Sequence, residues 1–163
     1  MIVTFFYTLL SALVACFITY KFTIRSKKHD IILQERILAF KTIHKELVFL
    51  SRYCHAIVAS RKGNEFAPRL EDLSEDVKKS ALTHWTYLQE IVDENLIFLP
   101  SRSKKLIDEI FFCLSILSNI ELQLAYSDPP EEVVISAPEA YENAIDKIDL
   151  CLENLFNELK LPI

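Results

Sequence analysis

The N-terminal part of the chain is an uninterrupted apolar stretch, because residues 2–20 contain no charged side chain. At a helical rise of about 1.5 Å per residue, a stretch of this length spans roughly 28 Å, which matches the hydrocarbon core of a bilayer. The pattern therefore predicts a transmembrane helix over residues 1–20. A buried helix of a globular protein is the alternative interpretation.

Basic residues follow this stretch directly, whereas no basic side chain precedes it; they are Lys21, Arg25, Lys27 and Lys28. An excess of positive charge on one side of a membrane helix favours the cytoplasm for that side. We therefore predict a basic membrane-surface segment over residues 21–29 that contacts anionic lipids of the bilayer. The same rule places the N-terminus outside and the C-terminal domain in the cytoplasm, at the inner (plasma) membrane.

Small side chains recur every four residues within the apolar stretch. They are Thr4, Thr8, Ala12 and Cys16, with Ala15 beside them. Membrane helices that present small side chains on one face can approach one another closely. The spacing predicts association of these helices, and hence a homo-oligomer, with a plain membrane anchor as the alternative.

From residue 30 onward, the apolar positions follow a helical period. In four segments they lie three and four residues apart, so that each segment has one apolar face. The faces are Phe40, Ile43, Leu47, Leu50, Cys54 and Ile57; Leu82, Trp85, Gln89, Val92, Leu96 and Leu99; Leu106, Ile110, Cys113, Leu117, Ile120 and Leu124; and Tyr141, Ile145, Ile148, Leu152, Leu155 and Leu159. The fold class is therefore all-α: a transmembrane helix followed by an antiparallel four-helix bundle over residues 30–163.

Local sequence features give the expected ends of these helices. The only glycine, Gly63, ends the first helix after basic residues, and the second is expected from about residue 72 to residue 98. Ser101 is expected to cap the third helix. Ser136, with Pro138 in the following turn, resembles a capping box that starts the fourth helix, and residues 133–135 before it are a candidate extended segment.

Composition and charge exclude several functional classes. A single glycine excludes glycine-rich phosphate loops and dinucleotide-binding turns. The chain has 18 basic and 23 acidic residues, and all the acidic ones lie beyond residue 29, whereas four of the basic ones precede it. The part from residue 30 onward therefore carries a net charge of −9, from 14 basic and 23 acidic residues. Binding of a nucleic acid duplex is therefore not expected.

One cluster of residues is a candidate anion site or ligand-binding site. It comprises Ser101, Arg102, Ser103, Lys104 and Lys105, at the expected start of the third helix. Free backbone N–H groups, hydroxyls and cations are the groups that bind phosphate at a helix N-terminus. A phosphorylated small-molecule ligand is one expectation for this corner, and a solvated basic surface is the other.

Residue types that carry enzyme chemistry are present but not suitably spaced. His29, His44, His55 and His84 share no metal-ligand spacing, and His84 is expected in the core. Cys54, Cys113 and Cys151 lie on or beside the apolar faces and are interpreted as reduced core thiols. Glu121 and Gln89 interrupt apolar faces and are candidates for a polar pair across the bundle or for a polar groove. We expect no catalytic residues, no metal, no cofactor and no enzymatic activity.

The layout of one N-terminal anchor and a cytoplasmic helical bundle resembles that of many small bacterial inner-membrane proteins. Among them are the CRISPR-associated membrane effectors that are gated by cyclic oligoadenylates in antiviral defence. The resemblance covers the whole chain in layout and rests on no diagnostic motif, so no site residue is carried over from it.

Two functions are compatible with these features. The first is a non-enzymatic, membrane-anchored sensor or interaction module whose bundle docks a partner protein. Its expected docking surface is an acidic group of residues, Glu71, Asp72, Glu75 and Asp76. The second is a ligand-gated effector that perturbs the membrane, based on the small-residue face and on the basic corner around Arg102.

Overall fold

The computed structural model describes the backbone of residues 2–64 and 68–159, and their side chains except for residues 2–6, 8–12 and 159. These residues form four α-helices, α1 (Ile2–Arg61), α2 (Ala81–Asn95), α3 (Ser101–Leu124) and α4 (Glu131–Leu159), and two short 3-10 helices, η1 (Leu70–Asp72) and η2 (Leu96–Phe98). No strand occurs among the described residues. The predicted all-α class is confirmed.

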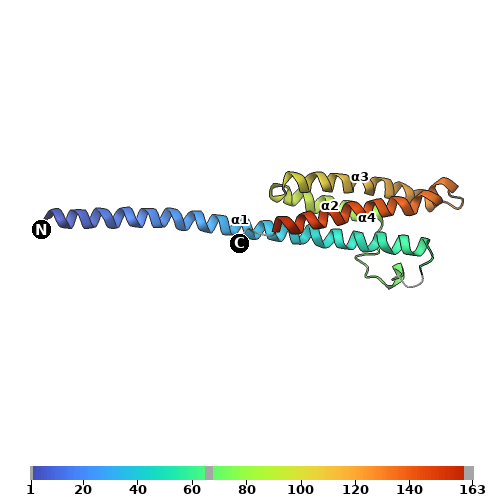
Figure 1. The fold of residues 1–163 in the computed structure, drawn as a ribbon, viewed down its shortest axis with the longest axis horizontal. Coiled ribbons are helices and arrows are strands. Elements are labelled where there is room, and N and C mark those ends of the chain that lie inside the picture. Colours follow the sequence, from blue (N-terminus) through green and yellow to red (C-terminus); the bar gives the residue numbers. More distant parts are fainter. Residues whose placement is uncertain (1, 65–67, 160–163) are drawn as a thin grey trace. The chain divides into compact units, whose positions relative to one another are not determined.

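The chain divides into two compact units, Met1–Leu38 and Ala39–Ile163. The first unit consists of the N-terminal part of α1. The second is a helical bundle formed by the rest of α1 with α2, α3 and α4. In this bundle α3 and α4 lie side by side along their length, as Figure 1 shows.

The prediction of a transmembrane helix is corrected by the structure. Among the described residues, no helix is long and apolar enough to cross a membrane. Lys21 and Arg25 follow the apolar residues on the same helix, whereas a membrane span needs about 20 predominantly apolar residues. The single-pass topology and the inner-membrane location are therefore not supported.

The apolar faces expected on three of the helices form the core of the bundle. Phe40, Ile43, Leu47, Leu50 and Cys54 of α1 are buried, as are Leu106, Ile110, Cys113 and Leu117 of α3 and Tyr141, Ile145, Ile148 and Leu155 of α4. Close packing of these side chains supplies most of the free energy that stabilises the bundle. The spacing of three and four residues therefore identified these faces correctly.

The buried face of α2 differs from the predicted one. Ala81, His84, Leu88 and Val92 point into the core, whereas Leu82 and Leu96 are exposed. The helix also begins at Ala81, nine residues after the expected start at residue 72. Its N-cap is Ser80, whose side chain accepts a hydrogen bond from the backbone N–H of Thr83.

The start of α4 and the capping residue of α3 also differ from the prediction. Helix α4 begins at Glu131, so residues 133–135 are helical and Pro138 lies inside the helix. The Pro130 carbonyl accepts hydrogen bonds from the N–H groups of Val133 and Val134. Two acidic residues in the first turn add to the stability of this start. Helix α3 does begin at Ser101, but the capping position is Pro100.

The end of α1 follows the prediction. Gly63 has a φ of 66°, in the left-handed region that glycine adopts without strain. The N–H of Gly63 donates to the Ser60 carbonyl, and the N–H of Asn64 donates to the Ala59 carbonyl. These two bonds form the Schellman arrangement and satisfy carbonyls that the helix end leaves without partners.

Pro138 provides a test of the α4 assignment. A proline inside a helix removes one backbone hydrogen bond and destabilises the helix by about 3 kcal/mol. It also lowers the conformational entropy of the unfolded chain, which stabilises the folded state by up to about 1 kcal/mol. The substitution Pro138→Ala should therefore raise the free energy of unfolding by about 1–2 kcal/mol. Urea denaturation followed by circular dichroism measures the change. Glu139→Ala, at the exposed neighbouring position, is the matched control. If the expected start at Ser136 were correct, Pro138→Ala would change the stability no more than the control does.

Candidate functional site

The interior of the bundle contains a polar cluster centred on the Glu121 carboxylate of α3. Its Oε1 accepts hydrogen bonds from the hydroxyls of Tyr53 on α1, at 2.5 Å, and of Tyr141 on α4, at 2.9 Å. The backbone N–H of Ala81 donates to Oε1 at 3.2 Å and to Oε2 at 3.0 Å. Ala81 is the first residue of α2, where the N–H has no acceptor within its own helix. One carboxylate therefore binds groups from all three other helices.

A second buried pair lies next to this cluster. His84 is fully buried, and its Nδ1 lies 2.7 Å from Oε1 of Glu46. Its Nε2 lies 3.3 Å from the Val77 carbonyl oxygen. One ring nitrogen of His84 therefore faces a carboxylate oxygen and the other faces a backbone carbonyl oxygen. The prediction that His84 belongs to the core is confirmed.

Aromatic packing joins the two groups. The ring centroid of Tyr53 lies 5.5 Å from that of His84 and 6.2 Å from that of Tyr141, the latter in an edge-to-face arrangement. Such contacts add to the energy of apolar burial. Glu46, Tyr53, His84, Glu121 and Tyr141 thus form one continuous network, which we call the polar cluster.

Burial changes the acidity of the phenol and thiol groups around the polar cluster. Burial, followed by the neighbouring Tyr141 and Glu121, raises the pKa of Tyr53 well above its usual value. Burial and the Glu121 charge raise the pKa of Tyr141 in the same way. Burial also raises the pKa of the Cys54 thiol, and it raises that of Cys151 to about 12. At neutral pH these groups stay protonated, which makes them poor nucleophiles.

The described residues contain no group of three or more histidine, cysteine, aspartate or glutamate side chains that could hold a metal ion. In the polar cluster, the Glu121 oxygens and the His84 nitrogens are already occupied by protein groups. The arrangement connects helices and leaves no described atom of these side chains directed at a ligand. We interpret the polar cluster as structural.

The predicted anion site keeps only part of its expected geometry. Ser101, Arg102 and Lys105 are exposed at the first turn of α3, and Lys104 is half-buried. Ser103, in contrast, is fully buried, and its hydroxyl accepts a hydrogen bond of 2.9 Å from the Asn154 amide. Ser103 therefore packs α3 against α4. Phosphate binding by this corner stays a prediction.

The residues predicted to associate in a membrane lie in the first unit. Ala15 and Cys16 are exposed, whereas the side chains of Thr4, Thr8 and Ala12 lie outside the described residues. The four basic residues of the expected membrane-surface segment, Lys21, Arg25, Lys27 and Lys28, are all exposed on α1. The structure leaves untested whether any of these positions takes part in association.

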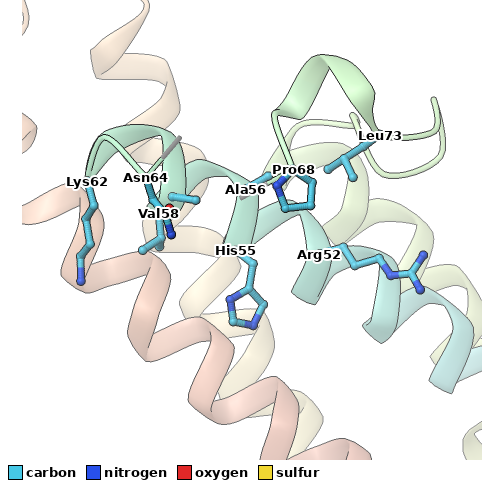
Figure 2. Close-up of a pocket in the computed structure, with 9 residues that line it drawn as sticks. Arg52, His55, Ala56, Val58, Lys62, Asn64, Pro68 and Leu73 are labelled. Atoms are coloured by element: carbon cyan, nitrogen blue, oxygen red, sulfur yellow. The ribbon is translucent and has the colours of Figure 1, made fainter. Parts of the chain in front are cut away.

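A hollow in the bundle lies where α1 ends. This pocket of about 590 Å³ is formed by the last turns of α1 and the segment that follows them. Figure 2 shows the lining residues, with Pro68 and Leu73 beside the helix and the side chains of His55 and Lys62 extending in the same direction from it. The sequence analysis missed this pocket, because several of its residues are small and no sequence motif marks them.

No family model, no curated protein and no solved structure matches this chain. The resemblance to CRISPR-associated membrane effectors therefore stays a prediction. Functional inference rests on the geometry of the chain itself.

The central role of Glu121 can be tested by an isosteric change. In Glu121→Gln, the side-chain NH2 group replaces one acceptor, so a buried donor loses its partner. The free energy of unfolding should fall by about 2–4 kcal/mol. Glu109→Gln is the matched control on the same helix, because Glu109 forms an exposed ion pair with Lys147. That substitution should cost no more than about 0.5 kcal/mol. Equal effects of the two substitutions would contradict the role of Glu121.

The raised pKa values predict a loss of stability in alkali. Unfolded cysteine and tyrosine side chains lose protons near pH 8.5 and pH 10, whereas the buried groups keep theirs. The free energy of unfolding is therefore constant below about pH 8 and falls above it. Each buried group contributes at most about 1.4 kcal/mol per pH unit. Urea denaturation from pH 7 to pH 11 measures how steeply the free energy of unfolding falls with pH. In a variant with both Tyr53→Phe and Tyr141→Phe, the decrease contributed by these tyrosines above about pH 10 should be absent, whereas the decrease contributed by the cysteines should remain. A stability that stays constant up to pH 11 would contradict the buried, protonated state.

Proposed function

We propose that the protein is a non-enzymatic helical interaction module that associates with a second copy of itself through the N-terminal part of α1. The bundle formed by residues 39–159 carries the sensor or docking function. The observation that carries the proposal is an exposed apolar seam on α1, and the composition of the polar cluster supports its non-enzymatic part.

The seam consists of large apolar side chains spaced seven residues apart. They are Phe17, Ile24, Ile31 and Leu38, which are 62%, 37%, 59% and 60% exposed. Tyr20, between the first two of these residues, and Leu13, which precedes them, lie on the same face and are also exposed. A helical face this apolar is unusual on a protein surface unless another surface covers it.

The spacing of the seam favours another helix as the covering surface. A repeat of seven residues keeps one face of a helix in contact with a partner helix that winds around it. Lys27 and Gln34 occupy the intervening positions farther along α1. Polar residues in such a seam lower its stability but fix the register of the two helices. A second copy supplies the same repeat and the same length, so the seam is complementary to itself.

The polar cluster supports the absence of catalysis in this proposal. The Glu121 carboxylate accepts hydrogen bonds from Tyr53, Tyr141 and the backbone of Ala81. The two ring nitrogens of His84 lie within hydrogen-bond distance of Glu46 and of the Val77 carbonyl. The raised pKa values of the buried thiols disfavour nucleophilic attack. The groups best suited to chemistry therefore maintain the fold.

Sedimentation equilibrium of the full chain tests the association. We expect the wild-type chain to form a dimer, and the variant with Ile24→Glu and Ile31→Glu to be monomeric, because four carboxylates would enter the seam of a dimer. The matched control carries Ser26→Glu and His29→Glu, which add the same side chains to the opposite, exposed face of α1. It should remain a dimer. A monomeric wild-type chain at about 50 μM, or a seam variant that still dimerises, would contradict the proposal.

A further inference from the structure

A site that the association of α1 does not involve lies at the other end of this helix. The pocket is lined by the last turns of α1 and by the segment leading into η1; its residues are Arg52, His55, Ala56, Val58, Ala59, Lys62, Asn64, Pro68 and Leu73. Its volume of about 590 Å³ falls within the usual range for small-molecule sites, roughly 300–1,000 Å³. The pocket is therefore large enough for a ligand of about ten to twenty heavy atoms.

Apolar side chains make up much of the lining of this pocket. Ala56 and Ala59 lie about one turn apart on α1, and their small side chains leave room beside the helix. Val58, Pro68 and Leu73 also line the pocket. Water in contact with such a surface is released when an apolar group replaces it, so the hollow favours the apolar body of a ligand.

The edge of the pocket is basic. Arg52 and His55 both line it and are exposed, and no hydrogen bond or ion pair is formed by their side chains among the described residues. Lys62 also lines the pocket, but it forms an ion pair with Glu142 of α4. Among the lining residues that the structure describes, none has an acidic side chain. The Arg52 guanidinium can donate two parallel hydrogen bonds to a carboxylate or to a similar anionic group.

We propose that this pocket binds a small apolar anion, with its apolar body over Ala56 and Ala59 and its charged group at Arg52. The combination of an apolar hollow and an unpaired guanidinium distinguishes this site from the corner at Ser101, which has cations but no described hollow. The size of the hollow matches a small molecule, for example a carboxylate with a chain of about ten carbons. The proposal adds a ligand class to the sensor part of the proposed function, and the site does not depend on dimerisation.

Fluorescence titration of the full chain with 1-anilinonaphthalene-8-sulfonate, an apolar anion, tests the site. We expect one bound probe per chain, displaced by decanoate but not by decanol, which lacks the charge. Arg52→Gln should weaken probe binding about tenfold through loss of the charge-assisted hydrogen bonds. Ala59→Trp, which fills the hollow, should abolish binding.

Two controls separate this site from other apolar surfaces that bind the probe. Lys147→Gln removes a cation that pairs with Glu109 elsewhere on the bundle, and it should leave the affinity unchanged. The Ile24→Glu and Ile31→Glu variant should also bind the probe, which separates failure of the pocket from failure of the dimer. Circular dichroism verifies that Ala59→Trp is folded, and Arg52→Gln provides an independent test at an exposed position. Equal affinities of the wild-type, Arg52→Gln and Ala59→Trp chains, or displacement by decanol as effective as by decanoate, would overturn the proposal.

Discussion

The bundle depends on one half-buried carboxylate that binds every helix around it. Glu121 of α3 accepts hydrogen bonds from Tyr53 of α1, from Tyr141 of α4 and from the first N–H of α2. An apolar core tolerates small shifts of one helix along another, whereas a buried donor that loses its acceptor costs about 1–3 kcal/mol. The hydrogen bonds to Glu121 therefore favour the register in which Tyr53, Tyr141 and Ala81 all reach this carboxylate. Glu121 therefore defines how the apolar faces meet, although burial of those faces supplies most of the stability.

This constraint also determines where function can lie. The interior side chains that could act in catalysis are Glu46, His84 and Glu121. They bind one another, other side chains or the backbone, and so they support the fold. The two features that we propose to bind other molecules lie at the surface, and both include residues of α1. They are the apolar seam from Phe17 to Leu38 and the pocket beside Ala56 and Ala59, which the segment after α1 also lines. In the proposed function, α1 thus provides both self-association and a ligand site.

Much of the fold could be predicted from the apolar spacing, because α1, α3 and α4 each bury a regular face. The predicted face of α2 was wrong, although His84 was expected in the core; the partner of His84, Glu46, lies 38 residues away in the sequence. Leu82 and Leu96 suggested the neighbouring face and are exposed. The prediction of a transmembrane helix relied on hydropathy alone. Glu121 was recognisable as an interruption of an apolar face, but its partners lie 20, 40 and 68 residues away in the sequence, so only the structure identifies them.

Hydrogen exchange at the Ala81 amide in the full chain tests the central role of Glu121 most directly. The first N–H of a helix normally exchanges rapidly, because it has no acceptor in its own helix. If Glu121 binds this group inside the bundle, the Ala81 amide exchanges as slowly as that of Leu88 in the buried part of α2, and Glu121→Gln abolishes the protection. Exchange of Ala81 at the rate of the exposed first turn, in the wild-type chain, would contradict the account.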